Sequence, residues 1–524
     1  MINIKDRKAY IIGGGVAGVA AAAFLIKDAG MKGGNIIIID RESVSGGGFD
    51  GQGSAEHGYL SRGYRMFEEI IYLSTYDLFS KIPSPDNPNK TLKDDFFAFN
   101  AGLKIIAKAR LIKDGKILDS SRMELNWRDR INLVKLLYYP EKYFGTKKIS
   151  DFFTAHFFKS NFWFMWATTY AFQPWHAVLE MKRYLCRFVH DAPRFNMSCV
   201  LSAPYCEHDF IILPLVKMLN KSGARFLNNA EVTDLDFALI NGKKTVTDII
   251  FRDAGRENIK VAHDDLVFVT NGSMMTDATV GSMDKPPTPA TGNSTAWNLW
   301  KNISKKSDGF GNPEVFCSST QKTGWESFTI TFKDSAFFEL VEKLSGNKAG
   351  TGGLITFKDS NWLMSITLPP QPYFKNQPAG TFVCWGYGLS PDKTGNFVNK
   401  KMSECGGKEI MEELFRHFGF SKDAPSIIKN ALCIPCFMPY ITAQFSPRNK
   451  SDRPAVVPPG TRNFAFIGQF VEIPNEIVFT VECSIRSAKT AVCRLLNLSE
   501  KIPPLYQKKY NIKSFFDGFR TILR

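Results

Sequence analysis

Residues 9–18 read Ala-Tyr-Ile-Ile-Gly-Gly-Gly-Val-Ala-Gly, and this stretch decides the fold of the first part of the chain. Its first four residues are apolar or aromatic and predict a short buried strand. Three glycines then turn the chain, and residues 19–27 have the composition of a helix. Residues 35–40 form a second apolar, β-branched run that ends in an acid. Together these segments predict a β-α-β unit with the glycines at the first strand-to-helix turn.

The spacing GxGxxG gives this turn a specific chemistry. Gly13 permits the tight turn, Gly15 lets the backbone approach a pyrophosphate, and Gly18 lets the helix pack against the strand. Free N–H groups at the start of the helix, helped by its dipole, attract phosphates. Asp40 follows where the ribose-binding acid is expected. The sequence therefore predicts a dinucleotide cofactor, with a glycine-rich turn that binds no ligand as the alternative.

The composition is that of a globular protein, with 44% hydrophobic and 22% charged residues, which excludes a disordered or fibrous chain. The 44 Phe residues, against 9 Trp and 16 Tyr, predict large apolar interiors or an apolar ligand. A formal net charge of +15 permits nucleic acid, an anionic membrane or an acidic ligand as a partner. Because the basic residues match no known reader motif, we expect no nucleic acid.

The ten cysteines are scattered and form no dense framework, which favours a reducing cytoplasm. Cys433-Ile-Pro-Cys436 is the single CxxC, and no HxxxH accompanies it. We therefore expect these cysteines to pack in the interior, and we expect no metal site. No stretch reaches the roughly 18 apolar residues that a membrane-spanning helix needs.

The tail 501–524 is basic and amphipathic. Its charged residues are Lys501, Lys508, Lys509, Lys513, Arg520 and Arg524 against Asp517. Apolar residues recur between them at roughly helical spacing, which suits the surface of an anionic bilayer. The tail therefore predicts a peripheral position at the inner face of the membrane. A terminal helix packed on the protein's own core is the alternative.

Several sequence blocks, taken in order, resemble the FAD-dependent oleate hydratases, historically called myosin-cross-reactive antigens. The blocks are Gly46-Gly-Gly-Phe-Asp50-Gly51, Arg62-Gly-Tyr-Arg65, Ala171-Phe-Gln-Pro-Trp175-His176, Glu180-Met-Lys-Arg183-Tyr, Thr270-Asn-Gly-Ser-Met274, Pro439-Tyr-Ile-Thr-Ala-Gln-Phe-Ser-Pro-Arg448, Phe466-Ile-Gly-Gln-Phe-Val-Glu472 and Val478-Phe-Thr-Val-Glu482. The resemblance runs from about residue 9 to about residue 495. It implies a hydro-lyase that uses FAD without net redox to add water across the cis double bond of oleic acid or a similar unsaturated fatty acid.

The resemblance implies an α/β fold of mixed α+β character. The expected parts are a discontinuous Rossmann-like FAD-binding domain (1–60, 200–283 and 455–495), an inserted fatty-acid substrate domain (61–199 and 284–454) and a C-terminal helix (496–524). The residues expected to bind FAD are Gly13, Gly15, Val16, Ala17, Gly18, Asp40, Arg41, Gly48, Arg62, Gly63, Arg65, Val232, Asn271, Gly272, Ser273, Gln469 and Glu472. The oligomeric state, monomer or homodimer, stays open.

The catalytic residues of the family transfer unevenly. Tyr205 stands at the family's catalytic Tyr and is a candidate proton donor, with a buried aromatic as the alternative, and His208 replaces that block's second Tyr. Met66 stands where the family has its water-activating Glu. Glu68 and Glu69 follow closely, but at least one should point away if a helix starts here. A Met cannot take a proton from water, so the water site is expected to be altered.

The stretch that binds the substrate carboxylate in the family is also changed. Thr367 is kept, but Pro369 replaces an Asn and Tyr373 replaces a His, so carboxylate recognition or chain length is expected to differ. Two rival interpretations remain. One is a flavin-dependent fatty-acid isomerase or oxidoreductase, and the other is a flavoprotein that binds fatty acids without catalysis.

Overall fold

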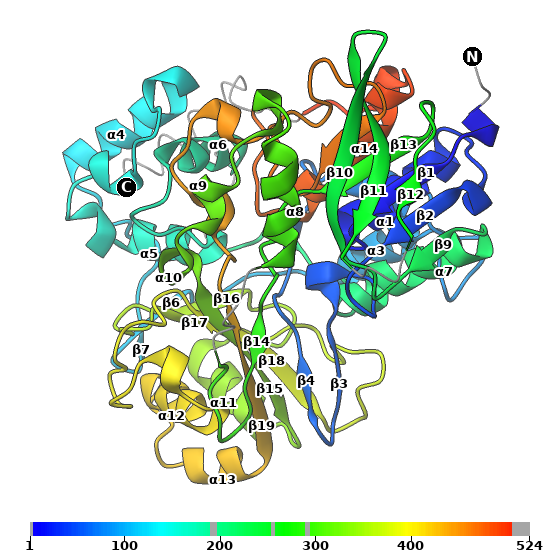
Figure 1. The fold of residues 1–524 in the computed structure, drawn as a ribbon. Coiled ribbons are helices and arrows are strands. Elements are labelled where there is room, and N and C mark those ends of the chain that lie inside the picture. The colour runs from blue at the N-terminus through cyan, green and yellow to red at the C-terminus, as the bar shows by residue number, and fades with distance from the viewer. Residues whose placement is uncertain (1–3, 189–195, 253–256, 289–293, 506–524) are drawn as a thin grey trace.

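The computed structural model describes residues 4–188, 196–252, 257–288 and 294–505 (Figure 1). A five-stranded parallel sheet has the order β20-β13-β1-β2-β9. Its strands are β1 (Ala9–Ile12), β2 (Ile36–Ile39), β9 (Arg225–Leu227), β13 (Leu266–Thr270) and β20 (Phe464–Ile467). These strands come from three stretches far apart in the sequence, so the sheet is discontinuous along the chain. The domain bounds themselves stay a prediction.

Helix α1 (Val16–Lys27) follows β1 directly and confirms the predicted β-α-β unit. Residues 19–25 are fully buried, which is the pattern of a helix covered on all sides. Its alanines let it pack closely against α14 (Val481–Leu495), the helix that follows β20. The sheet and these two helices thus place the glycine turn, the end of β13 and the end of β20 at one edge.

After α7 (Leu213–Lys221) the chain forms two strands in succession, β9 and β10 (Val232–Ile240). Asn229 adopts a left-handed conformation with φ of 53° and breaks the strand between them. β10 continues into an antiparallel sheet with β11 (Lys243–Phe251) and β12 (Ile259–Lys260), which lies beside the parallel sheet (Figure 1).

The second large sheet lies in the lower part of Figure 1 and has the order β14-β19-β15-β18-β17-β16-β6-β7. Its strands are β6 (Leu111–Lys113), β7 (Lys116–Ile117), β14 (Thr279–Val280), β15 (Trp325–Phe332), β16 (Leu354–Phe357), β17 (Met364–Thr367), β18 (Phe382–Gly388) and β19 (Ala431–Met438). One face packs on α11 (Ala336–Ser345), α12 (Gly407–Phe418) and α13 (Ala424–Lys429), through a cluster that includes Phe328 and Ile330. The opposite face carries Trp325, Trp385 and Tyr387.

On that opposite face, α5 (Asn161–Tyr170) packs against β16, whereas α2 (Leu73–Phe79) packs on α14, α7 on α1 and α8 (Thr295–Ser304) on β10. The other helices are α3 (Leu92–Gly102), α4 (Trp127–Tyr138), α6 (Val178–Phe188), α9 (Glu314–Cys317) and α10 (Thr320–Thr323). Four short strands form two further pairs, β3 (Gln52–Ser54) with β4 (Gly58–Leu60) and β5 (Phe67–Glu68) with β8 (Val200–Leu201). β4 packs on β15 and β19. α5 and α6 lie on the left side of Figure 1, above the second sheet.

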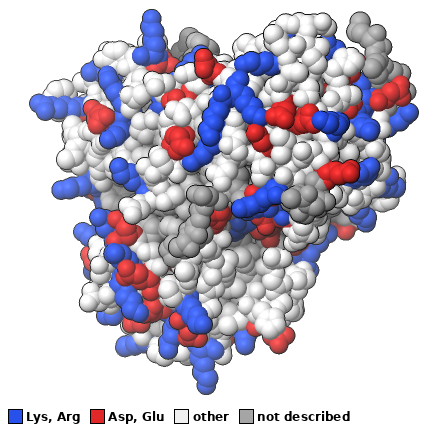
Figure 2. All heavy atoms as spheres, in the orientation of Figure 1, with Lys and Arg blue, Asp and Glu red and all other residues white. Residues whose placement is uncertain are grey.

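The ten cysteines are free, and Cys433 and Cys436 are buried in β19, as the packing interpretation expected. Within the described ranges, no group of three potential metal ligands occurs, and no helix has both the length and the apolar character to cross a bilayer. Residues 506–524 of the predicted C-terminal helix lie outside the described residues. Figure 2 shows Lys and Arg spread over one face of the molecule, with Asp and Glu between them.

Candidate cofactor and substrate cavities

A cavity of about 140 Å³ lies where the glycine turn, the loop after β2 and the ends of β13 and β20 meet. The residues expected to bind FAD that line it are Gly15, Val16, Ala17, Gly48, Arg65, Gly272, Ser273 and Gln469. Parallel strands end at one edge of a sheet, and ligands of such sheets bind there. The fold therefore gathers these residues from four distant parts of the chain.

The glycines of the turn differ in what a side chain would meet. A Cβ on Gly13 would lie 2.8 Å from the Thr270 hydroxyl, and φ at Gly13 is +107°. A Cβ on Gly18 would lie 1.9 Å from the carbonyl oxygen of Gly13. On Gly15 it would meet only the Cα of Gly47, at 3.8 Å. Gly13 and Gly18 thus serve the packing of strand and helix, whereas Gly15 keeps space open beside the cavity.

The start of α1 is suited to an anion. Gly15 is the N-cap and makes no side-chain cap, and the first turn of the helix contains no acid. Val16 and Ala17 line the cavity, so free N–H groups and the positive end of the helix dipole border it. The hydroxyl oxygen of Thr270, at the same edge, is buried without a hydrogen-bond partner. These features fit the pyrophosphate of a dinucleotide.

Asp40 is held beside the glycine turn. Its Oδ2 accepts a hydrogen bond from the Gly14 N–H at 2.8 Å, and its Oδ1 accepts one from the Glu42 N–H at 3.1 Å. Burial raises the pKa of Asp40, against these backbone hydrogen bonds. Arg41 is paired with Glu42 near the surface. Asp40 therefore shapes the turn in addition to any contact with a ribose.

Two other residues expected at the cofactor, Asn271 and Val232, are not among the residues that line this cavity. The amide of Asn271 donates to the Phe470 carbonyl at 3.0 Å, while its buried Oδ1 has no hydrogen-bond partner. Val232 is buried at the start of β10, beyond the residues that return the chain to Asp40.

A second cavity of about 170 Å³ adjoins the first. The two share the lining residues Arg65, Met274, Phe479, Thr480 and Val481. Much of the remaining wall comes from α5, α6 and the second sheet, with the aromatic side chains Tyr170, Tyr184, Phe188, Trp325, Trp385 and Tyr387. A mainly apolar cavity that meets a dinucleotide site can hold a long apolar substrate against a cofactor.

The second cavity is also lined by four residues of one loop: Arg62, Gly63, Arg65 and Met66. Arg62 forms an ion pair with Asp50 and donates to the Gly47 carbonyl at 3.0 Å. The guanidinium of Arg65 lies 5.0 Å from the centre of the Phe49 ring. These arginines therefore tie the loop after β2 to the lining of the second cavity.

Met66 is followed directly by strand β5, and the next helix, α2, begins only at Leu73. β5 pairs with β8, so that Glu68 lies opposite Val200, and both residues line the second cavity. Glu68 is 7% exposed, whereas Glu69 is exposed to solvent. One acid of the pair does point away, as expected, but the cause is a strand and not a helix.

A buried polar cluster next to Met66 was not recognised from the sequence. Glu207 is 4% exposed and accepts a hydrogen bond from the Arg65 N–H at 2.8 Å. The hydroxyls of Tyr64 and Ser202 are 2.8 Å apart, and Tyr64 lines the cavity. Burial raises the pKa of Glu207, although Arg65 acts to lower it. The only signal in the sequence was that Glu207 lies within the block that contains Tyr205.

Tyr205 is not among the residues that line the two cavities. Its ring lies under the Lys375 ammonium group, 5.4 Å from the ring centre. His208 begins a short π-helix (His208–Ile212), and its Nδ1 lies 3.7 Å from Asp209. Its Nε2 is buried without a hydrogen-bond partner. The structure thus brings Met66 to the apolar cavity but leaves both other catalytic candidates outside its wall.

Thr367 and Tyr373 do not line the cavity either. Thr367 donates to the Gly353 carbonyl at 3.1 Å and lies between Leu354 and Trp385 across the sheet. Tyr373 is buried against Tyr64 and Phe374. Their predicted contact with substrate carboxylate stays a prediction.

Arg110 provides a cation on the side of the second cavity that the first does not reach. It is 1% exposed, and it donates to the Leu354 carbonyl and, at 2.8 Å, to the Thr169 hydroxyl. Leu354 and Thr169 line only the second cavity. Burial lowers the pKa of Arg110 to about 10, so it stays charged at neutral pH.

The model of the MCRA family matches residues 6–493 of this chain. The chain belongs to the MCRA family. This confirms the resemblance found in the sequence blocks. The oleate hydratase of Streptococcus pyogenes serotype M49 is 36% identical to this MCRA protein over 99% of the chain and 90% of its own length. The linoleate hydratase of Lactiplantibacillus plantarum is 31% identical over 92% of each chain.

Solved structures share the fold of this MCRA protein at low sequence identity. An oxidoreductase from Methanosarcina mazei has a TM-score of 0.52 and 14% identity, covering 93% of this chain and 100% of its own. Cyclohexylamine oxidase from Brevibacterium oxydans has a TM-score of 0.53 and 12% identity, covering 95% and 100%. These similarities confirm the predicted α/β fold class.

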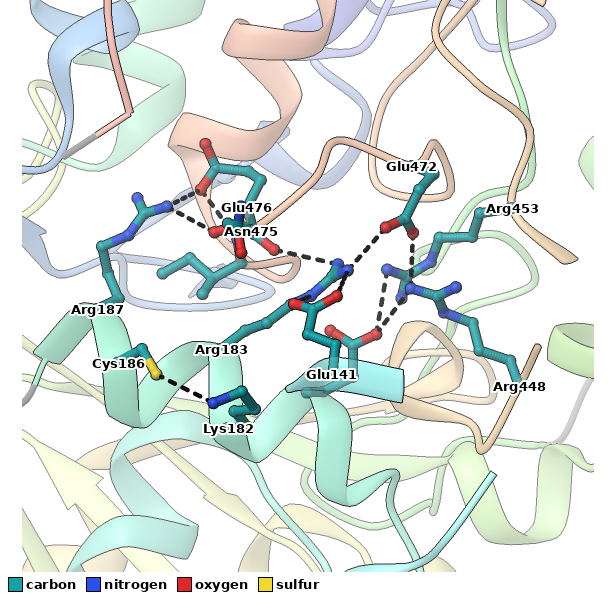
Figure 3. Close-up of polar contacts among 12 residues, drawn as sticks. Glu141, Lys182, Arg183, Cys186, Arg187, Arg448, Arg453, Glu472, Asn475 and Glu476 are labelled. Carbon is teal, nitrogen blue, oxygen red and sulfur yellow. Dashed lines mark hydrogen bonds and ion pairs between the residues drawn. The ribbon is translucent and has the colours of Figure 1, made fainter. Parts of the chain in front are cut away.

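In this MCRA protein, Glu472 lies in a buried network of ion pairs and does not line either cavity (Figure 3). Its Oε1 lies 2.7 Å from Arg183 on α6, and its Oε2 lies 2.7 Å from Arg448. Burial acts to raise the pKa of Glu472, but the surrounding arginines outweigh it and lower that pKa. The network joins α6 to the segment that leads into α14.

Proposed function

We propose that this protein is an FAD-dependent hydratase that adds water across the cis double bond of oleic acid or a similar unsaturated fatty acid. Membership of the MCRA family and two hydratase relatives that span nearly the whole chain support this function. The observation that carries the proposal is the junction of the two cavities. A largely apolar cavity with a buried cation on one side meets a cavity built for a dinucleotide.

The residues of the first cavity fit FAD. Gly15, Val16 and Ala17 would hold its pyrophosphate, with Ser273 and Gln469 nearby. Hydration changes no net oxidation state, so FAD would supply a planar, polar surface beside the substrate without consuming electrons. Arg65 lines both cavities, which supports a contact of its side chain with both FAD and substrate.

The reaction itself needs an acid and a site for one water molecule. A proton is added to one carbon of the double bond, water bonds to the other carbon, and a base takes the proton that this water loses. Addition of the proton leaves positive charge on the other carbon of the double bond. The apolar wall around Trp385 and Phe188 excludes other water molecules that would compete to bond to that carbon. From the family resemblance, Tyr205 is proposed as the proton donor.

The protein is proposed to be located in the cytoplasm, with residues 501–524 in contact with an anionic membrane surface. Free fatty acids partition into membranes, so such docking would bring the enzyme to its substrate. Sedimentation of the full chain with anionic and with neutral vesicles tests this contact.

The function is tested by incubating the FAD-loaded protein with oleic acid in deuterated water, with and without a flavin reductant. We expect a hydroxystearic acid with one carbon-bound deuterium, detected by mass spectrometry. A product that has the molecular mass of oleic acid, apart from incorporated deuterium, and a shifted double bond would indicate an isomerase instead. Absence of product from oleic, linoleic and palmitoleic acids, together with tight binding of these acids, would indicate a carrier.

A further inference from the structure

Met66 leaves the substrate cavity without a carboxylate at the position where the resemblance places one. Met offers a thioether, which cannot take a proton from water at neutral pH. Water capture still requires a proton acceptor next to the cavity. A replacement must therefore be a carboxylate that faces the same cavity and has a fixed position.

Glu68 meets the first of these conditions. Met66 immediately precedes β5 and Glu68 is the second residue of that strand, and side chains two residues apart along a strand share a face. Both residues line the cavity. Val200, which pairs with Glu68 across β5 and β8, lines it too.

Glu68 is also fixed in position. Its Oε2 accepts hydrogen bonds from the N–H groups of Ile70 and Ile71, both at 2.9 Å. Its backbone carbonyl accepts a hydrogen bond from the Tyr76 hydroxyl at 3.0 Å. The side chain is thus held by its own turn while it borders the cavity, and a positioned base needs no reorganisation when the reaction occurs.

Other acids near the cavity fit less well. Glu69 points to solvent. Glu207 is buried, but it is bonded to the Arg65 backbone and does not line the cavity. Glu482 accepts hydrogen bonds from Ser74, Thr75 and Arg486, outside the cavity lining.

We propose that Glu68 is the catalytic carboxylate of this protein and has taken over the role of the Glu that Met66 replaces. The step is balanced: the Glu68 carboxylate accepts one proton from water as the water oxygen bonds to the substrate carbon. That proton restores the donor for the next turnover, so the net change is the addition of one water molecule. This assignment rests on the hydratase function proposed above.

The test compares Glu68→Gln with Glu69→Gln, each loaded with FAD and given oleic acid. The Gln oxygen can still accept from the Ile70 and Ile71 N–H groups, so the turn should keep its structure. We expect Glu68→Gln to lower kcat by about 100-fold or more, the scale of a lost general base. Its affinity for oleic acid, measured by calorimetry, should stay unchanged. Glu69→Gln should behave as the wild type.

A rescue experiment separates catalysis from a structural role. In the double variant Met66→Glu, Glu68→Gln, a carboxylate returns two residues away on the same face, and hydration should recover at least tenfold over Glu68→Gln. No recovery, with FAD content and thermal unfolding unchanged, would overturn the assignment. If the wild type is active and Glu68→Gln is equally active, the assignment of Glu68 is overturned but the proposed hydratase function is not. A wild type that forms no hydroxy acid would overturn the proposed function as well.

Discussion

The Nη2 atom of Arg110 donates to the hydroxyl oxygen of Thr169 at 2.8 Å, directly behind the wall of the apolar cavity. Because Thr169 accepts this hydrogen bond, its own hydroxyl hydrogen is left to donate elsewhere. Thr169 is partly exposed at the cavity, whereas Arg110 is buried. A neutral donor backed by a charge is well suited to the carboxylate of a fatty acid.

We therefore expect Arg110→Met to raise KM for oleic acid by roughly 10- to 100-fold, the scale of a lost hydrogen bond to a charged group. The KM for methyl oleate should stay unchanged, because the ester has no negative charge. Steady-state kinetics with both substrates measures the difference. Arg122→Met is the control, since the Arg122 side chain is 84% exposed. An equal rise for acid and ester would mean that Arg110 acts only on structure.

The same substitution should impair different properties at Gly15 and Gly18: FAD affinity at Gly15 and stability at Gly18. Gly15→Ala adds a methyl group that meets only the Gly47 Cα at 3.8 Å, so the fold should be kept while FAD affinity falls about tenfold. Gly18→Ala forces a Cβ to within 1.9 Å of the Gly13 carbonyl oxygen and should cost about 1–3 kcal/mol of stability. Flavin titration and thermal unfolding measure the two effects. Equal loss of stability in both variants would contradict this division.

Tyr205→Phe should lower hydration by about 10²- to 10⁴-fold if the hydroxyl is the proton donor. Tyr64→Phe is the informative comparison, because Tyr64 lines the cavity and Tyr205 does not. Deuterium incorporation from heavy water, followed by mass spectrometry, measures protonation of the double bond. Full activity of Tyr205→Phe alongside an inactive Tyr64→Phe would assign the donor to Tyr64.

The sequence predicted the parts of the molecule that depend on neighbours in the chain. The turn from Gly13 to Gly18 has its strand, helix and glycine chemistry within a few residues, so spacing alone identifies it. The ion pairs could not be predicted in this way. Glu180 and Arg448 are 268 residues apart and meet only after both sheets and α6 have packed. Arg110 likewise lies 244 residues from Leu354, whose carbonyl accepts its hydrogen bond.

The two buried ion pairs that Glu472 forms, with Arg183 and with Arg448, should make the stability of the protein depend on pH. The pKa of Glu472 lies below its ordinary value of 4.5, so its contribution is fully present above that pH. It is lost as pH falls through the lowered pKa of the folded protein. At neutral pH, Glu472→Gln should cost about 3–5 kcal/mol, because it leaves buried arginines without their partner.

Thermal unfolding between neutral and acidic pH measures this effect. The midpoint of the wild type should fall more steeply below pH 4.5 than that of Glu472→Gln, because the variant has already lost the titrating group. Glu404→Gln is the control, since its pair with Lys401 lies at the surface and should contribute little at any pH. Parallel curves for the wild type and Glu472→Gln would show that other acids control the acid unfolding, and would remove Glu472 from that role.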